Sequence, residues 1–401
     1  MEDDHARHGG TQDIRVPAME RAEEGRQVMA MTVFMKTALF ISVAGVFLFV
    51  ASQCSKSAVR RSADGNSLRT LKVSRNYDGK KFYNTEYTVV TRPGTFWKNM
   101  ANFFRGDEIR RPPFALKKFT VNSSALHDSG AEHLCVTWMG HSTVLIEIDG
   151  KRFLTDPVWS ERVSPIPFMG PKRFFDPPCA LSELPPLDGV IISHDHYDHL
   201  DSDTVRWFAS RGVDFYAPLG VGRYLLEWGV APEKIHELDW WEDIVLGQHR
   251  LAATPARHFS GRKFINGNDT LWASWVIAGP GHRVFYGGDG GMFSGFHEIG
   301  SKLGPFDVTM LEIGAYHENW SEIHLGPRGA LEAHASLRGK ILMPIHWGTF
   351  TLAFHDWDGP VRELIRGADD DDIKLLVPEP GRSIVPGNDP VIQRWWEEGA
   401  H

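Results

Sequence analysis

The chain has 401 residues, of which 42% are hydrophobic and 11% aromatic, so it can bury a sizeable core as one large domain or two ordinary ones. The formal net charge of −8 is spread along the sequence, which argues against a nucleic-acid partner held through phosphate contacts. Cys54, Cys135 and Cys179 lie far apart and form no C-x-x-C pair. This spacing argues against a disulfide scaffold and a thiolate zinc site, so any metal must be held by His, Asp or Glu.

The N-terminal region predicts association with a membrane. Residues 1–36 carry charges of both signs without periodicity, which is typical of a disordered tail. Residues 37–55 are uncharged and mostly apolar, but the strictly apolar part, 38–51, is short for a helix that needs about 20 residues to cross a bilayer. The segment therefore fits either a membrane anchor or a signal peptide, with Met31 or Met35 as the start. Basic residues after it favour the cytoplasmic side, whereas a cleaved signal would place the domain outside, so the side of the membrane stays open.

The remaining chain predicts one large domain between two short segments. Residues 56–130 form a linker and lead-in, residues 131–385 a globular domain, and residues 386–401 a C-terminal tail. Strands are predicted at 134–138, 143–148, 151–154, 190–192, 215–218, within 235–258, at 274–277, 283–286, 307–311, 340–345 and 373–377. Helices are predicted at 203–210, with Asp203 as the N-cap, and at 221–228, 329–338 and 361–366. Strands in two batches, each followed by helices, indicate an α/β protein with two sheets between helical layers, an αββα sandwich.

The densest polar cluster of the chain follows the apolar run 190–192. It contains His194, His196, Asp198 and His199 within six positions. A short apolar run of this kind is typical of a buried strand, so the cluster lies on the loop that leaves the strand. Core packing does not require such a density of imidazole and carboxylate, whereas zinc prefers these ligands. The cluster therefore predicts a metal site rather than an ordinary polar loop.

Four later residues share this position just beyond a strand: His258, Asp289, His324 and His346. A lone histidine is more often structural than a ligand, so the argument depends on all of them together. The glycines around Asp289 allow the backbone to approach closely and to hold the carboxylate at a tight turn. With the cluster, His258, Asp289 and His346 make seven ligands, more than one tetrahedral zinc takes, and an odd number fits two ions that share one carboxylate.

These residues carry a resemblance to a known family. The motif H-x-H-x-D-H at 194–199, followed by a later His, Gly-Asp-Gly and a final His, resembles the metallo-β-lactamase superfamily. The match is closer to the phospholipases D that hydrolyse N-acylphosphatidylethanolamine, and it covers about 130–380. The stretches that carry it are Trp138-Met-Gly-His-Ser-Thr-Val144, Leu154-Thr-Asp-Pro157, Met169-Gly-Pro-Lys-Arg-Phe174, Ser182-Glu-Leu-Pro-Pro186, Ile192 to Asp201, His258-Phe-Ser-Gly261 and Ile345-His-Trp-Gly-Thr349.

The resemblance implies two zinc ions per chain and a role for each site residue. One zinc would be held by His194, His196 and His258. The other would be held by Asp198, His199 and His346, with Asp289 as the bridge. A hydroxide between the ions would be the nucleophile, oriented by Asp198, and Tyr197 and His324 would contact the substrate phosphate. Tyr197 fits a structural aromatic residue equally well.

The function implied is a membrane-associated phosphodiesterase that cleaves N-acylphosphatidylethanolamine to an N-acylethanolamine and phosphatidic acid. The implied partners are therefore the phospholipid and the membrane, and a homodimer is left open. The aromatic loop 156–186 would accommodate acyl chains at Trp159, Phe168 and Phe174. The chain departs from the family at Gly290, where a threonine is usual, and at Ile323, where the phospholipase has glutamine, so the headgroup contacts stay open. The alternatives are a hydrolase of a soluble phosphorylated metabolite or lactone and a non-enzymatic metal-binding scaffold.

Overall fold

The structure of the protein is a computed structural model, and it describes residues 74–122, 133–166, 168–262, 267–387 and 390–398. The predicted N-terminal tail, the apolar segment 37–55 and the first part of the linker lie outside these residues. Among the helices of the described residues, none is long and apolar enough to cross a membrane.

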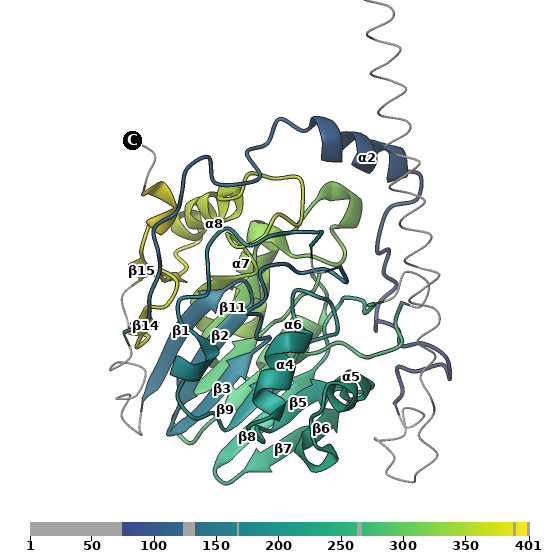
Figure 1. The fold of residues 1–401 in the computed structure, drawn as a ribbon, viewed down its shortest axis with the longest axis vertical. Helices are drawn as coiled ribbons and strands as arrows, with labels where there is room; N and C mark the ends of the chain where they lie inside the picture. The colour runs from purple at the N-terminus through teal and green to yellow at the C-terminus, as the bar shows by residue number, and fades with distance from the viewer. Residues whose placement is uncertain (1–73, 123–132, 167, 263–266, 388–389, 399–401) are drawn as a thin grey trace, which may run out of the picture. The chain divides into compact units, whose positions relative to one another are not determined.

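Two sheets form the centre of the domain (Figure 1). The first has the spatial order β14 (Ser383–Ile384), β1 (Leu134–Gly140), β2 (Thr143–Ile148), β3 (Lys151–Thr155), β4 (Gly189–Ile191), β5 (Phe215–Pro218) and β6 (Ile235–Leu238). The second has the order β12 (Gly339–Ile345), β11 (Phe306–Glu312), β10 (Arg283–Tyr286), β9 (Ser274–Ala278), β8 (His249–Thr254) and β7 (Asp243–Leu246). β13 (Leu376–Val377) and β15 (Val391–Ile392) form a short parallel pair.

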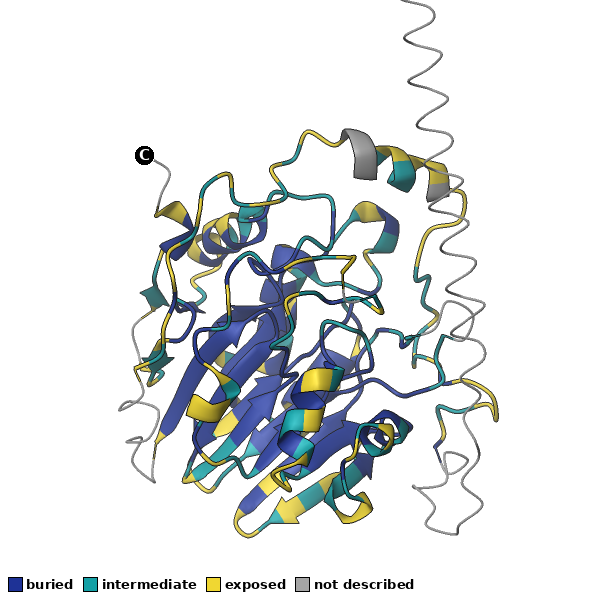
Figure 2. Cartoon of the chain, in the orientation of Figure 1, coloured by how far each residue is buried: buried dark blue, intermediate teal, exposed yellow. Residues whose placement is uncertain are grey.

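Side chains of the first sheet alternate between two hydrophobic layers, because successive residues of a strand point to opposite faces. In β2, Val144 and Ile146 belong to the large central cluster, whereas Leu145 belongs to a second cluster. The second cluster also contains Val205 and Leu225, which lie on the helices α4 (Ser202–Ala209) and α5 (Gly222–Glu227). Both faces of the sheet are thus covered, which explains why β1 and β2 are buried along their whole length (Figure 2).

The helices α6 (Gly295–Leu303), α7 (Gly326–Leu337) and α8 (Gly359–Asp370) contribute to the large cluster on the side of the second sheet. Helix α7 contacts β11 and β12, and α8 packs on α7. The layer order is therefore helices, sheet, sheet, helices, which confirms the predicted αββα sandwich. The sequence did not predict α6, and the cap of α4 is Asp201 rather than Asp203, because the side chain of Asp201 accepts a hydrogen bond from the backbone N–H of Asp203.

Residues outside the predicted domain also belong to the core. The lead-in contributes Phe82 and Phe119, each at most 2% exposed. It also contains a helix outside the core, α2 (Phe96–Arg105). The segment predicted as a C-terminal tail contributes Trp395 and Trp396, which are buried against the ring of Trp347. These aromatic residues join the large cluster around the second sheet.

Candidate metal centre

The predicted ligands gather where strands of the two sheets end. The loop 193–199 leaves β4, His258 follows β8, Asp289 follows β10 and His346 directly follows β12. β3, β4 and β5 are parallel, as are β10, β11 and β12, so their carboxyl ends lie at one edge of each sheet. An open α/β arrangement commonly places its binding site at this edge. All seven predicted metal ligands lie within this region.

The first cluster consists of His194, His196 and His258 with Asp289. The Nε2 atom of His194 lies 2.8 Å from Nδ1 of His196, and this Nδ1 lies 3.4 Å from Nε2 of His258. Three ring nitrogens thus face a common point. Donors around a tetrahedral zinc, at about 2.1 Å from the ion, lie about 3.4 Å apart. The His196–His258 separation equals this value and the His194–His196 separation is shorter, so the three nitrogens lie close to the arrangement that such an ion requires.

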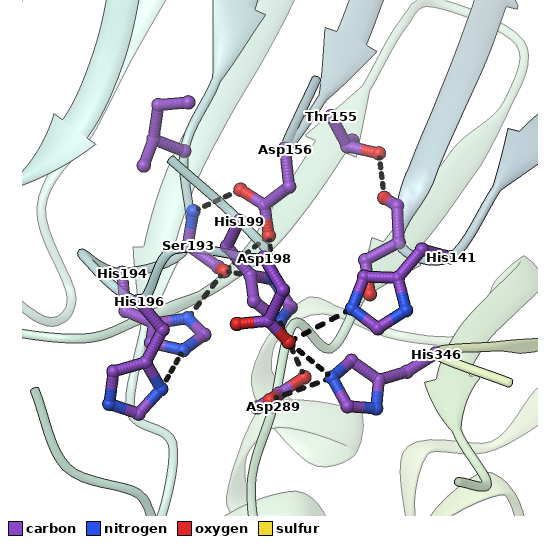
Figure 3. A network of polar contacts seen from close by, with 12 residues as sticks. His141, Thr155, Asp156, Ser193, His194, His196, Asp198, His199, Asp289 and His346 are labelled. Atoms are coloured by element: carbon purple, nitrogen blue, oxygen red, sulfur yellow. Dashed lines mark hydrogen bonds and ion pairs between the residues drawn. The ribbon is translucent and has the colours of Figure 1, made fainter. Parts of the chain in front are cut away.

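The second cluster consists of Asp198, His199 and His346, together with a residue that the sequence did not predict, His141 (Figure 3). The Oδ2 atom of Asp198 lies 3.2 Å from Nε2 of His346, 3.5 Å from Nε2 of His199 and 3.0 Å from Nε2 of His141. His141 stands in the turn between β1 and β2, within one of the stretches that carry the family resemblance.

Asp289 lies between the two clusters. Its Oδ2 is 3.1 Å from Nε2 of His346 and 3.9 Å from Nε2 of His258, and its Oδ1 is 3.2 Å from Nε2 of His199. This Oδ1 and the Nε2 of His199 are buried without a hydrogen bond among the described residues. Two facing polar atoms of this kind are expensive to bury unless they share a cation, so the donor set fits two metal positions that share Asp289.

The protonation of the clusters also fits a cation. Burial lowers the pKa of His194 well below its usual value, so this imidazole is neutral, the form that binds metals. For His346, burial opposes the charged form, but the carboxylates of Asp289 and Asp198 outweigh it and raise the pKa to about 10. The same balance raises the pKa of His199 well above its usual value. A cation would replace these protons as the counter-charge of the carboxylates.

A second layer of hydrogen bonds orients the ligands. The Oδ2 atom of Asp156, which is fully buried, lies 2.7 Å from Nδ1 of His199 and accepts from the hydroxyl of Tyr286 at 2.5 Å. Its Oδ1 accepts from the N–H of Ser193 at 2.7 Å. The Nδ1 atom of His258 lies 2.9 Å from the carbonyl oxygen of Ile323. Such partners determine which ring nitrogen faces a metal.

The lead-in segment completes the surroundings of the first cluster. Asn84 donates to the carbonyl oxygen of His258 at 2.7 Å and accepts from its N–H at 3.0 Å. Val90 and Thr91 line a pocket of about 280 Å³ that also contacts His196, Asp198, Asp289 and His346. The segment predicted as a linker therefore forms part of the wall above both clusters.

Comparisons with known proteins agree with this geometry. Residues 151–347 match the family described as the β-lactamase superfamily domain. An uncharacterised protein of Mycobacterium tuberculosis is 46% identical over 278 residues, which cover 68% of this chain and 74% of that protein. N-acyl-phosphatidylethanolamine-hydrolyzing phospholipase D 1 of Caenorhabditis elegans is 38% identical over 231 residues, 55% of this chain and 65% of that protein. A possible metal-dependent hydrolase from Veillonella parvula has the same fold, with a TM-score of 0.50 at 16% identity over 63% of this chain and all of that one.

The chain belongs to the metallo-β-lactamase superfamily. Within this superfamily it is related to the phospholipases D named above, and it is a metal-dependent hydrolase.

Tyr197 lies on the metal-binding loop of this metallo-β-lactamase fold, but its polar atom has a partner within the protein. Its hydroxyl donates to the carbonyl oxygen of Arg262 at 3.0 Å, and the guanidinium of Arg262 lies 4.0 Å from the centre of its ring. The same guanidinium donates to the carbonyl oxygens of Asp195 and Leu200. Tyr197 and Arg262 thus support the loop that carries the ligands, and contact of Tyr197 with substrate stays a prediction.

His324 lines the pocket beside the clusters, at the position that the resemblance implies for a substrate contact. Its Nδ1 lies 2.6 Å from Oε2 of Glu312, whose side chain is fully buried at the end of β11. The other oxygen of Glu312 accepts from the N–H groups of Gly290 and Leu325. Burial opposes the charge on His324, but Glu312 outweighs it and raises the pKa of His324. The sequence did not predict Glu312, because it is a single carboxylate within a strand.

The loop 156–186 does not behave as one aromatic surface. Phe168 is 78% exposed. Trp159, however, is partly buried and donates its indole N–H to the carbonyl oxygen of Cys179, and Phe174 packs edge-on against Trp357. Trp159 and Phe174 thus pack partly against the protein itself, and contact of the three side chains with acyl chains stays a prediction.

Proposed function

We propose that the protein is a zinc-dependent phosphodiesterase of the phospholipase D type. It hydrolyses N-acylphosphatidylethanolamine to an N-acylethanolamine and phosphatidic acid. The observation that carries this proposal is the pair of His/Asp clusters that share Asp289 on one side of a pocket, with His324 beside them. The relationship to the C. elegans phospholipase supports the choice of substrate.

The two metal positions suit a phosphodiester. Two zinc ions held there would supply positive charge for the phosphate oxygens and would lower the pKa of a bound water to near neutral. His194, His196 and His258 would hold one ion, Asp198, His199 and His346 the other, and Asp289 would contact both. These residues would bring the phosphorus close to the point between the clusters and exclude bulk water from it.

The leaving group of this reaction is an alkoxide, which needs a proton. The imidazole of His324 is the group in position to supply it, because Glu312 engages its Nδ1 and leaves Nε2 for the pocket. A general acid of this kind contributes about 10² to 10⁴ to the rate. Glu312 acts through His324 by holding the orientation of the ring.

The size of the pocket indicates how a lipid would bind. A volume of about 280 Å³ accommodates the phosphodiester and its immediate substituents, but not two acyl chains. The chains would therefore remain in the bilayer, and the protein would work at its surface. The apolar side chains of Trp97 and Phe168, 72% and 78% exposed, would contact the lipid.

The bond that is cut distinguishes this function from its alternatives. The purified full-length protein is incubated with N-acylphosphatidylethanolamine vesicles in oxygen-18 water. Attack at phosphorus places the label in phosphatidic acid and none in the N-acylethanolamine. Label in a free fatty acid would show an acylhydrolase instead.

The small pocket also favours a second candidate, the hydrolysis of a soluble phosphorylated metabolite or lactone. Turnover of such compounds without turnover of any phospholipid would replace the phospholipase proposal by this one. Asp289→Asn is the inactive control. His282→Asn is the matched active control, because His282 binds Asp149 and belongs to none of the clusters that could hold a metal.

A further inference from the structure

His141 is the residue of the second cluster that neither the motif nor the family pattern assigns to a metal. Its ring is 3% exposed and lies 4.1 Å from the ring of His346 and 5.4 Å from that of His199, measured between centroids. Its Nε2 faces Oδ2 of Asp198 at 3.0 Å (Figure 3). The ligand atoms of these four residues lie within 4.8 Å of one another.

The direction of the ring is determined by this cluster. The other ring nitrogen, Nδ1, is buried and makes no hydrogen bond among the described residues. The ring of Phe350 packs nearly perpendicular to the imidazole, with the two centroids 5.1 Å apart, and offers no polar atom to it. The Nε2 atom is therefore the polar atom that the fold presents, and it points to the same place as Nε2 of His199 and His346.

The backbone of His141 is held in a conformation that L-residues avoid. Its φ angle is 54°, and that of His346 is 60°. Both residues follow strands and are tied directly together, because the N–H of His346 donates to the carbonyl oxygen of His141 at 2.9 Å. The hydroxyl of Thr349 accepts from the N–H of His141, and the indole of Trp138 donates to the same carbonyl oxygen. A strained backbone that several neighbouring groups hold in place in this way is found mainly at functional sites.

The donor count then differs between the two positions. The first has three histidines and Asp289. The second has Asp198, His199, His346, Asp289 and, in addition, His141. We propose that His141 is a metal ligand, the fifth protein donor of the second position, so that the two ions have unequal coordination. This proposal concerns the metal centre and holds for any substrate.

The alternative role for His141 is to donate a hydrogen bond to Asp198 without touching the ion. One-bond coupling between cadmium-113 and nitrogen-15 separates the two roles, because it occurs only at nitrogens bonded to the metal. The full-length protein is labelled with nitrogen-15 at its histidine rings and both positions are loaded with cadmium-113, with occupancy checked by elemental analysis. We expect coupled nitrogens on six histidines: His141, His194, His196, His199, His258 and His346.

The wild-type spectrum alone decides the proposal. Coupling on five histidines, with none at His141, would overturn it. In His141→Asn one coupled nitrogen should disappear while five remain, and asparagine tolerates the left-handed backbone at this position. Metal affinity of the second position should fall at least about 10- to 100-fold, with less effect on the first. His282→Asn should keep all six couplings and the wild-type affinities.

Discussion

Asp156 offers the sharpest test of how the site controls its ligands, because one buried carboxylate determines the orientation of His199. It is 0% exposed and receives hydrogen bonds from the N–H and hydroxyl of Ser193 and the hydroxyl of Tyr286, beside its contact with Nδ1 of His199. Burial and the charge of Asp156 hold the pKa of Tyr286 well above its usual value, so this hydroxyl remains a donor. The N–H and hydroxyl of Ser193, the hydroxyl of Tyr286 and the Nδ1–H of His199 therefore all require an acceptor.

Asp156→Asn keeps the shape of the side chain and removes part of this acceptor capacity. The amide oxygen can still accept from the N–H of Ser193, and the two hydroxyls can reorient to accept from the new NH₂ group. His199 cannot adapt in this way while its proton stays on Nδ1. It must transfer the proton to Nε2, the atom that faces Asp198 and Asp289. A protonated Nε2 cannot bind a metal.

The expected magnitudes follow from these contacts. Loss of one hydrogen bond to a charged group lowers the free energy of unfolding by about 1.5–3 kcal/mol, which leaves a domain of ordinary stability folded. Metal affinity at the second position should fall about 10- to 100-fold. With saturating metal, the stabilisation that the ion confers should then decrease by about 1.4–2.7 kcal/mol.

The assay combines competition with a chromophoric chelator and chemical unfolding with and without metal. Glu237→Gln is the matched control, since Glu237 is 9% exposed and accepts from the N–H groups of Gly220 and Gly222, outside the clusters. Both variants should lose stability, but only Asp156→Asn should lose metal affinity. If Asp156→Asn binds metal as the wild type does, the proposed control of the His199 tautomer is wrong.

Asp289→Asn should lose both ions in elemental analysis, because both clusters use this carboxylate, and retention of two ions would refute the shared position. Glu312→Gln should lower kcat by about 10²-fold with little change in KM or metal content, because it disturbs the proton donor His324 and not the binding of substrate. An equal change in kcat and KM would contradict this role of Glu312. Burial lowers the pKa of His334 to about 4, below its value in the unfolded state. As the pH drops from about 6.5 to 4, the unfolded state therefore binds a proton that the folded state does not, and the free energy of unfolding falls by about 3 kcal/mol in total. His334→Gln should remove this contribution from urea unfolding curves measured at pH 5 and pH 7.5. Burial also raises the pKa of Cys135 and Cys179 to about 12, so iodoacetamide should modify neither thiol until the protein unfolds, as followed by peptide mass spectrometry.

The ligand positions could be predicted from the sequence because they depend on local patterns. The loop 193–199 carries four ligands within six positions behind an apolar strand, and a strand that is buried on both faces leaves a clear signal. Asp289 and His346 follow strands with glycine or tryptophan beside them. Parallel strands bring their carboxyl ends to one edge, so the order of strands and polar residues already implies that these side chains meet.

The residues that support the ligands could not be predicted in the same way. His141, Asp156 and Glu312 are single polar residues at strand ends, without neighbours of the same kind in the sequence. His141 and Asp156 adopt a positive φ angle, although neither position carries the glycine that would indicate it in the sequence. The roles of all three residues arise from contacts with residues between 12 and 208 positions away, such as Glu312 with His324, Asp156 with Tyr286 and His141 with Thr349.

The lead-in was predicted as a linker because it is rich in Arg, Asn, Gly and Pro. Its contribution depends instead on a few long-range contacts, in which Asn84 binds the backbone of His258, 174 positions away, and the N–H of Val89 donates to Glu322, 233 positions away. Glu322 also pairs with Arg257 at 2.8 Å, next to His258. No pattern within the segment encodes such pairings.

Strain and burial together explain why the ligands form one rigid site. His141, Asp156 and His346 all have positive φ angles, and each such residue costs about 1–3 kcal/mol. The backbone of His141 is held by Trp138, Thr349 and His346, and that of Asp156 by Ile191 and Thr143. The three side chains lie around Asp198 and His199. Removing the ion leaves buried carboxylates that only protons can neutralise, so the strained backbone and the metal stabilise the same arrangement. Loss of metal should therefore loosen the turn between β1 and β2 and the end of β12 before the rest of the sandwich, which amide exchange with and without chelator would detect. Uniform exchange across the domain after removal of metal would refute this coupling.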